Sequence, residues 1–285
     1  MKIVVIGDVI EDVIVIPNGQ IRPNTDTLAT IRKTMGGSAA NVASWLAHLG
    51  SSVSFQAAVN YLDSEKIRLD LSGIDCQLQE SKKPTGSLVA LIEGQGRSML
   101  TDRGANQDLD LGKIDPRGFG IVYLSGYALL GKKTYEVTSF LEASKKAGAL
   151  IAIDPGSYGF IQDFGVSEYR VLLLCADIAF PNSEEEQLLE LAGKLPLTVI
   201  TKGAEGVSAV TKDGLEISSP ALSAELVDPT GAGDAFCAGY LASLATLDLA
   251  NWLETDSIKK ALESGQRAGA KAIAGYGARP NSSTV

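Results

Sequence analysis

One short stretch, residues 228–236 with the sequence DPTGAGDAF, constrains this chain more than any other. It begins with a turn-forming Asp-Pro pair, continues with two glycines around an alanine, and leads into residues 235–246, which are predicted to be helical. Glycines let the backbone approach a ligand closely and let several N–H groups point the same way. The start of a helix adds the positive end of its dipole. The stretch therefore predicts an anion site, most simply for a phosphate group.

Asp234 places a carboxylate at the start of that predicted helix. A passive phosphate site has little use for a second negative charge. The carboxylate is useful if it orients and deprotonates a hydroxyl group while the amides of Gly231, Ala232 and Gly233 receive the charge of a phosphoryl group. The alternative is an ordinary glycine turn in which Asp234 is the helix N-cap. This stretch alone does not separate the two interpretations.

A second glycine pair, Gly36-Gly37, precedes a predicted helix at residues 40–49 that ends at Gly50. Gly37 again permits close approach of the backbone to a ligand. Asn41, in the first turn, carries both hydrogen-bond donors and an acceptor, which suits the hydroxyl groups of a substrate. The alternative is that the two glycines only mark a loop.

Strand and helix patterns alternate along most of the chain. Residues 2–7 form an apolar run typical of a strand buried on both faces. Asp8, Glu11 and Asp12 follow at once, where open α/β sheets bind ligands. Further strands are expected at residues 51–59, 120–124, 149–153, 176–180, 197–201 and 206–210, and helices at 63–72, 132–147, 183–193 and 257–274. This alternation predicts an α/β fold with a doubly wound, mostly parallel sheet sandwiched by helices.

Two segments do not fit the main sheet. Residues 27–34 alternate apolar and polar side chains, as half-exposed strands do, and residues 85–92 and 97–101 read as a hairpin. Segments 12–34 and 85–104 are therefore expected to form a small β-sheet lid on a single domain that spans residues 1–285. The Gly/Pro/Ser-rich tail from Gly275 is expected to fray at its end.

Composition excludes several classes of protein. The net charge is −9 and no cluster of five basic residues occurs, which argues against nucleic-acid binding. No apolar run reaches the about 18 residues of a membrane span. Three isolated cysteines and the lack of a signal-peptide pattern predict a soluble, cytoplasmic protein. The single histidine, His48, cannot build a His-rich zinc site.

The two glycine segments, in this order and at this separation, resemble the paired signatures of the ribokinase-like, or PfkB, carbohydrate kinases. Between them, Asn182-Ser183-Glu184-Glu185 resembles the Asn-x-x-Glu motif of that family, and Thr201-Lys202-Gly203 resembles its strand-end Thr-x-Gly. The resemblance covers essentially the whole chain. It implies an α/β sandwich with a β lid, and transfer of the γ-phosphoryl group of ATP to a sugar-type hydroxyl.

The resemblance also implies roles for single residues. Asp234 resembles the catalytic base, with the amides of residues 231–233 as the anion hole. Substrate hydroxyls would be held by Asp12, Gly37 and Asn41. The nucleotide side of the site would comprise Asn182 and Glu185, which arrange Mg²⁺ and phosphates through water, and Thr201 and Gly203, which line the nucleotide. Two loops that cradle a monovalent cation such as K⁺ in some members would be represented by Asp228, Thr230, Ala272 and Gly277.

Three features depart from the family pattern. Residues 59–63, VNYLD, stand where a Gly-x-Asp-x-x-Gly segment is usual, and residues 124–127 lack an expected acidic residue. Ser38 replaces the lysine of typical ribokinases, so ribose is not expected to be the best substrate. Arg103 could reach the site from the lid or form a surface ion pair.

The sequence thus predicts an ATP- and Mg²⁺-dependent kinase that phosphorylates a primary hydroxyl of a sugar. A nucleoside kinase of the same fold is the main alternative, and a non-catalytic sugar or nucleotide sensor is a weaker one, since a sensor needs no base such as Asp234. An exposed small sheet is a liability unless it is covered, so a homodimer through the lid is a further hypothesis.

Overall fold

The computed structural model describes residues 1–93 and 96–280. Its main sheet has nine strands: β1 (Lys2–Ile6), β4 (Ser52–Asn60), β5 (Asp75–Ser81), β8 (Ile121–Ser125), β9 (Leu150–Asp154), β10 (Ile178–Ala179), β11 (Leu197–Thr201), β12 (Val207–Thr211) and β13 (Glu216–Ser219). They lie in the order β13-β12-β11-β10-β9-β8-β1-β4-β5. Neighbours from β11 to β5 are parallel, whereas the pairs β11–β12 and β12–β13 at one edge are antiparallel. The predicted doubly wound, mostly parallel sheet is confirmed.

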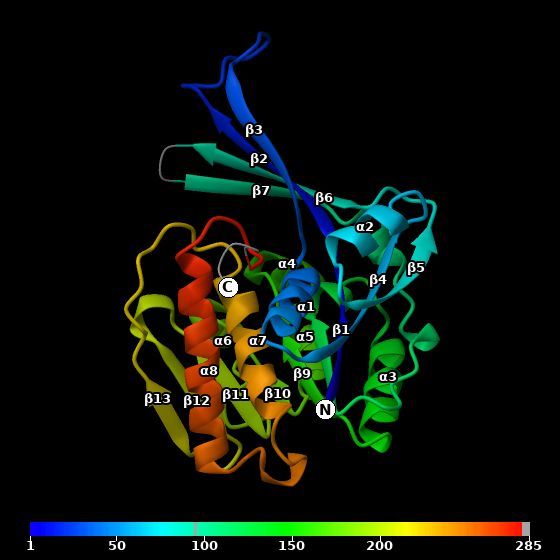
Figure 1. Ribbon diagram of the computed structural model, residues 1–285, viewed down its shortest axis with the longest axis vertical. Helices are drawn as coiled ribbons and strands as arrows, with labels where there is room; N and C mark the ends of the chain where they lie inside the picture. Colours follow the sequence, from blue (N-terminus) through cyan, green and yellow to red (C-terminus); the bar gives the residue numbers. More distant parts are fainter. Residues whose placement is uncertain (94–95, 281–285) are drawn as a thin grey trace.

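Helices cover both faces of this sheet (Figure 1). One layer holds α1 (Ser38–His48), α7 (Ala232–Leu244) and α8 (Thr255–Ile273), and the other holds α3 (Thr134–Lys146), α4 (Tyr158–Phe164), α5 (Val166–Leu173) and α6 (Ser183–Leu189). Successive side chains of a strand point to opposite faces, so Ile3 and Val5 of β1 join the first core while Val4 and Ile6 join the second. Uninterrupted apolar runs such as residues 2–6 are therefore what this architecture requires.

The lid is a separate four-stranded sheet at the top of Figure 1, formed by β2 (Ile10–Pro17), β3 (Ala29–Gly36), β6 (Gly86–Glu93) and β7 (Gly96–Asp102) in the order β3-β2-β6-β7. These strands fall within or next to the two predicted lid segments. The tip of the predicted hairpin, residues 94–95, lies outside the described residues, as does the end of the tail, residues 281–285. The short helix α2 (Ser64–Asp70) follows β4.

Several elements differ from the sequence prediction. No expectation covered β5, α4, α5 or β13, and β10 has two residues rather than five. Helix α6 ends at Leu189, earlier than predicted, because Glu190 adopts a left-handed conformation with φ 49°. Among the described residues, no helix has the length and apolar character that crossing a membrane requires.

The strand order places the site. The chain moves from β1 to β4 and β5 on one side, and then returns to β8 on the other side of β1. The carboxyl ends of β1 and β8 therefore flank a topological switch point, the usual position of a ligand in open α/β sheets.

Candidate active site

The chain crosses from the core to the lid directly after β1 and returns at the Gly36-Gly37 pair. Gly37 has φ +97°, and a Cβ atom there would lie 2.7 Å from the carbonyl oxygen of Asp8, so only glycine fits. This close approach lets the buried carboxylate of Asp8 accept hydrogen bonds from the backbone amides of Ser38 (2.9 Å) and Ala39 (3.3 Å). Asp8 thus fixes the N-terminus of α1 rather than facing solvent.

The second glycine loop meets the first at Asp234. Helix α7 begins at Ala232, with Gly231 as its N-cap at φ +77°, so Asp234 lies inside the first turn. Its carboxylate accepts hydrogen bonds from the Ser38 hydroxyl (2.8 Å) and from Nδ2 of Asn41 (2.8 Å). The alternative in which Asp234 caps its own helix is wrong. Instead, the carboxylate is held between the N-termini of α1 and α7.

The surroundings of Asp234 change its acidity. Burial raises the pKa of this carboxyl to about 7, helped by the charges of Asp154 and Asp8, while the hydrogen bonds from Asn41 and Ser38 lower it. A carboxyl group with a pKa near neutrality can be ionised and still take up a proton, which is what a general base needs.

The three predicted anion-hole residues lie at the start of α7. The amide of Ala232 donates to the carbonyl of Pro229 at 3.3 Å, and Gly233 is exposed. Gly231 packs against the C-terminal tail, because a Cβ atom there would lie 2.6 Å from Cα of Ala278. The loop therefore rests on the tail.

Asp12, on β2 of the lid, points back toward the crossing at Gly36, where an added Cβ atom would clash with its carboxylate. Burial raises the pKa of Asp12 to about 6; Asp8 raises it further and Arg279 lowers it. A cavity of about 650 Å³ is lined by Asp12 together with residues of the predicted cation loops and the tail, among them Asp228, Thr230, Gly277 and Arg279.

The predicted cation loops are joined through Asp228. Its carboxylate accepts hydrogen bonds from the amides of Thr230 (2.9 Å) and Gly277 (3.1 Å). Ala272 lies in the last turn of α8 rather than in a loop. In the described parts of the chain, no group of three or more His, Cys, Asp or Glu side chains is placed to hold a metal ion.

Asn182 and Glu185 form a capping box at the start of α6. The Asn182 side chain accepts from the amides of Glu184 and Glu185 (2.9 Å each), and the Glu185 carboxylate accepts from the amide of Asn182 (2.9 Å). Glu185 is only 6% exposed, and burial beside Asp154 raises its pKa. A β-bridge joins Asn182 to Thr201, so this box lies next to the end of β11 and the turn at Gly203.

Arg103 anchors the lid edge to the core. Its guanidinium donates to the carbonyl oxygens of Tyr127 (2.6 Å) and Leu130 (2.9 Å), beyond β8. These partners are backbone carbonyls rather than the carboxylate of a surface ion pair, and a contact of Arg103 with the substrate stays a prediction.

The unusual segment at residues 59–63 also holds the lid. The Thr85 hydroxyl, just before β6, donates to the Asp63 carboxylate (2.6 Å) and accepts from the amide of Asn60 (3.1 Å). The Asn60 side chain donates to the carbonyl of Lys83 (2.8 Å). These contacts give the segment a structural role at the base of the lid.

The sequence interpretation missed two residues at the site, Asp154 and Arg279. Asp154 ends β9 and accepts from the amide of Gly156 (2.8 Å). Arg279 lies in the tail and contacts Asn41. An aspartate at the end of a buried parallel strand was a usable signal; a single arginine in a glycine-rich tail was not.

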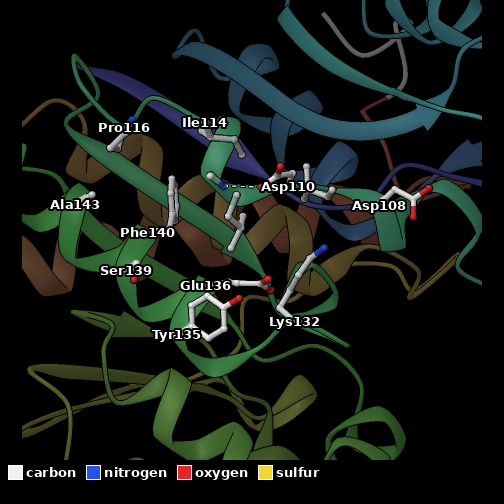
Figure 2. A pocket seen from close by; sticks show the side chains of 13 residues that line it. Asp108, Asp110, Ile114, Pro116, Lys132, Tyr135, Glu136, Ser139, Phe140 and Ala143 are labelled. Atoms are coloured by element: carbon white, nitrogen blue, oxygen red, sulfur yellow. Dashed lines mark hydrogen bonds between the residues drawn. The ribbon is translucent and has the colours of Figure 1, made fainter.

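A different hollow, of about 480 Å³, lies against α3 (Figure 2). Lys132, Tyr135 and Glu136 line it from one side and the segment around Asp108 and Asp110 from the other. Its lining includes none of the residues that the sequence singles out.

Comparison with known proteins identifies relatives over nearly the whole chain. The profile of the family described as "pfkB family carbohydrate kinase" matches residues 1–285. An ATP-dependent ribose-1-phosphate kinase of Halopiger xanaduensis is 27% identical over 90% of this chain and 87% of its own length. A fructokinase of Escherichia coli is 27% identical over 97% of this chain and 94% of its own. The crystal structure of adenosine kinase from Sinorhizobium meliloti superposes with a TM-score of 0.81 at 22% identity, covering 98% of this chain and 95% of that one.

Proposed function

Because the chain belongs to the pfkB family of carbohydrate kinases, we propose that it transfers the γ-phosphoryl group of ATP to a primary hydroxyl of a sugar. The observation that carries the proposal is the carboxylate of Asp234, held at two helix N-termini by Ser38 and Asn41. A partly buried carboxyl with a pKa near 7 beside a glycine turn suits deprotonation of an alcohol next to an anion site.

In this mechanism Asp234 takes the proton of the attacking hydroxyl. The amides at the start of α7 and the positive end of its dipole face the charge that grows on the phosphoryl group. Asp12 and Asn41 are the proposed contacts to substrate hydroxyls, since a carboxylate accepts from a vicinal diol and an amide accepts and donates. Phosphoryl transfer needs such positioning more than covalent catalysis.

The residues present fit a magnesium ion that is carried by phosphate oxygens and water. Within the described residues there is no cage of carboxylates for a divalent ion, and Mg²⁺ bound to nucleotides usually keeps several waters. Asn182 and Glu185 would hold those waters, while Thr201 and Gly203 would line the nucleotide. When bound, the ion neutralises charge on the phosphates.

We expect turnover to require Mg²⁺ and to rise when K⁺ is present. The first part rests on the need to neutralise phosphate charge. The second rests on Asp228, which ties the loops at Thr230 and Gly277 together beside α7. The test for K⁺ compares turnover rates in a potassium salt and in the salt of a bulky organic cation at equal ionic strength. Equal rates in the two salts would leave these loops with a structural role only.

The substrate should be a polyhydroxylated compound other than free ribose. Ser38 is short and uncharged, and its hydroxyl is engaged with Asp234. One relative is named a ribose-1-phosphate kinase, and another is named a fructokinase, after a ketohexose. The test is a coupled ADP-release screen over pentoses, hexoses, ketoses, sugar acids, sugar phosphates and nucleosides. If ribose were phosphorylated about tenfold faster than every other acceptor, the argument from Ser38 would be overturned. If a nucleoside were the best acceptor, the alternative of a nucleoside kinase would be established.

We expect the lid to close over the bound substrate, since excluding water protects ATP from hydrolysis. Hydrogen exchange with and without substrate should show increased protection at residues 12–34. Unchanged protection there would contradict closure.

The outer face of the lid supports a homodimer. The strand register places Val13, Val15, Ile31, Val89 and Leu100 on one face, and Ile31 and Leu100 are 61% and 65% exposed. A second copy of the chain would cover this face. Light scattering of the wild type and of Ile31→Glu tests it: a monomeric wild type contradicts the dimer.

A further inference from the structure

The C-terminal tail reaches the candidate site through Arg279. Its Nε donates to Oδ1 of Asn41 (3.2 Å) and its Nη2 donates to the carbonyl oxygen of Gly36 (3.2 Å). Its Nη1 forms an ion pair with Asp70 at the end of α2. The side chain is only 16% exposed. One guanidinium therefore joins α1, the end of the lid strand β3 and α2.

Arg279 dictates which way the Asn41 amide faces. A guanidinium has only donors, so the Asn41 atom that faces it must be the oxygen. The nitrogen of the same amide then points at Asp234, to which it donates at 2.8 Å. If the amide turned over, its nitrogen would face the guanidinium and its oxygen would face the carboxylate, and both contacts would become repulsive.

We propose that Arg279 is a positioning residue, an inference that rests on the proposed function. By fixing the amide of Asn41, Arg279 holds the carboxylate of Asp234 in the orientation for proton transfer. The tail is itself secured, because its Ala278 carbonyl accepts from Nε1 of Trp45 (2.9 Å) and its Gly277 amide donates to Asp228 (3.1 Å). Arg279 also lines the cavity that contains Asp12.

Removing Arg279 has a defined electrostatic consequence. The Asn41 hydrogen bond lowers the pKa of Asp234. Without Arg279 the amide is free to rotate, this hydrogen bond weakens, and the carboxyl becomes harder to ionise. The other titratable groups near Asp234 are Asp8, Asp154, Tyr123, Tyr127 and Cys237. Arg279 also lowers the pKa of Asp12, so the substitution raises the pKa of that carboxyl as well, and the titration of Asp234 itself must be followed.

A purely structural role for Arg279 would give a different result. If it only fastened the tail to Asp70 and Gly36, its loss would lower thermal stability or raise KM without moving the pH profile. The matched control is Arg267→Ala, which removes an exposed arginine of α8 that forms an ion pair with Glu263 in the same helix.

The experiment compares wild type, Arg279→Ala, Arg279→Lys, Asn41→Ala and the Arg279→Ala/Asn41→Ala double variant with the best substrate of the screen. Arg279→Ala should lower kcat at pH 7 by about tenfold or more and move the acid limb of the kcat profile to higher pH, while KM for ATP stays unchanged. Arg279→Lys, which keeps a cationic donor, should recover part of the loss. In the double variant the Arg279 substitution should add little to Asn41→Ala. Additive effects, or an unmoved pH profile, would overturn the proposal.

A measurement without turnover separates this inference from the proposed function. The Asp234 carboxyl is titrated by ¹³C NMR in wild type and Arg279→Ala, with the signal assigned by its loss in Asp234→Asn. A wild type that phosphorylates no acceptor overturns the proposed function, yet a pKa of Asp234 that rises in Arg279→Ala still supports the positioning role. An unchanged pKa in a folded Arg279→Ala protein overturns the inference even when the wild type is an active kinase.

Discussion

Asp234→Asn should fold like the wild type and lose about 10²–10⁴-fold in kcat, the usual contribution of a general base. The asparagine can keep both contacts, because its oxygen accepts from Asn41 and its nitrogen donates to the Ser38 hydroxyl. Only the capacity to take a proton is lost. The measurement is kcat with ATP and the best substrate.

The control for this variant is Asp256→Asn, which makes the same change at an exposed position in the first turn of α8. It should keep full activity. A loss of less than about threefold in Asp234→Asn would remove Asp234 from the role of base, since that is far below the range expected for general-base catalysis.

The same substitution, Asp234→Asn, should also change how the free energy of unfolding depends on pH. The pKa of Asp234 is raised from 3.8 to about 7, so the folded state favours the protonated form. The contribution of the protonated Asp234 carboxyl to the free energy of unfolding is fully present below about pH 4, and it is lost as the pH rises through about 7. At pH 8, urea unfolding should therefore find Asp234→Asn more stable than wild type, by up to about 4 kcal/mol, and the difference should shrink toward acidic pH.

Asp12→Ala should lower kcat/KM by about 10²-fold for every accepted substrate, because substrate hydroxyls would lose a charged acceptor in a partly buried site. Asp12 lies against Gly36 and lines the same cavity as Arg279, whose positive charge lowers the pKa of Asp12. The measurement is kcat/KM for at least two chemically different acceptors.

Asp26→Ala is the matched lid control, because Asp26 is exposed in the loop between β2 and β3. It should behave as wild type. If Asp12→Ala affected one substrate and spared another, Asp12 would be a specificity contact rather than a general one, and this prediction would be wrong.

The sequence predicted those parts of the site that are local in the chain. Gly37 and Gly231 were recognisable because positive φ and close packing leave a glycine signature. Asn182 and Glu185 were recognisable by a spacing of three, and that same spacing produces the capping box seen at α6. What the spacing could not reveal is that Asp234 bonds to Ser38 and Asn41, almost two hundred residues earlier.

The missed features have physical reasons. Arg279 acquires its contacts only through tertiary packing, 238 residues from Asn41. The strand β5 pairs at the sheet edge and its sequence, DCQLQES, is mostly polar, so no apolar run identifies it. Helices α4 and α5 have seven and eight residues and are separated by Gly165, too short for a clear helical period.

The way the lid joins the core bears on how such an enzyme can diverge. The chain enters and leaves the lid at short connections. For the half formed by β2 and β3 these are residues 7–9 and 36–37, and for the half formed by β6 and β7 they are residues 82–85 and 103. Asp12 travels with the lid, whereas Ser38, Asn41 and Asp234 stay with the helices of the core. Duplicated genes could therefore exchange residues 10–36 and 86–102 as cassettes and inherit the proposed phosphoryl-transfer residues unchanged. Both cassettes must be exchanged together, because β2 lies between β3 from its own segment and β6 from the other.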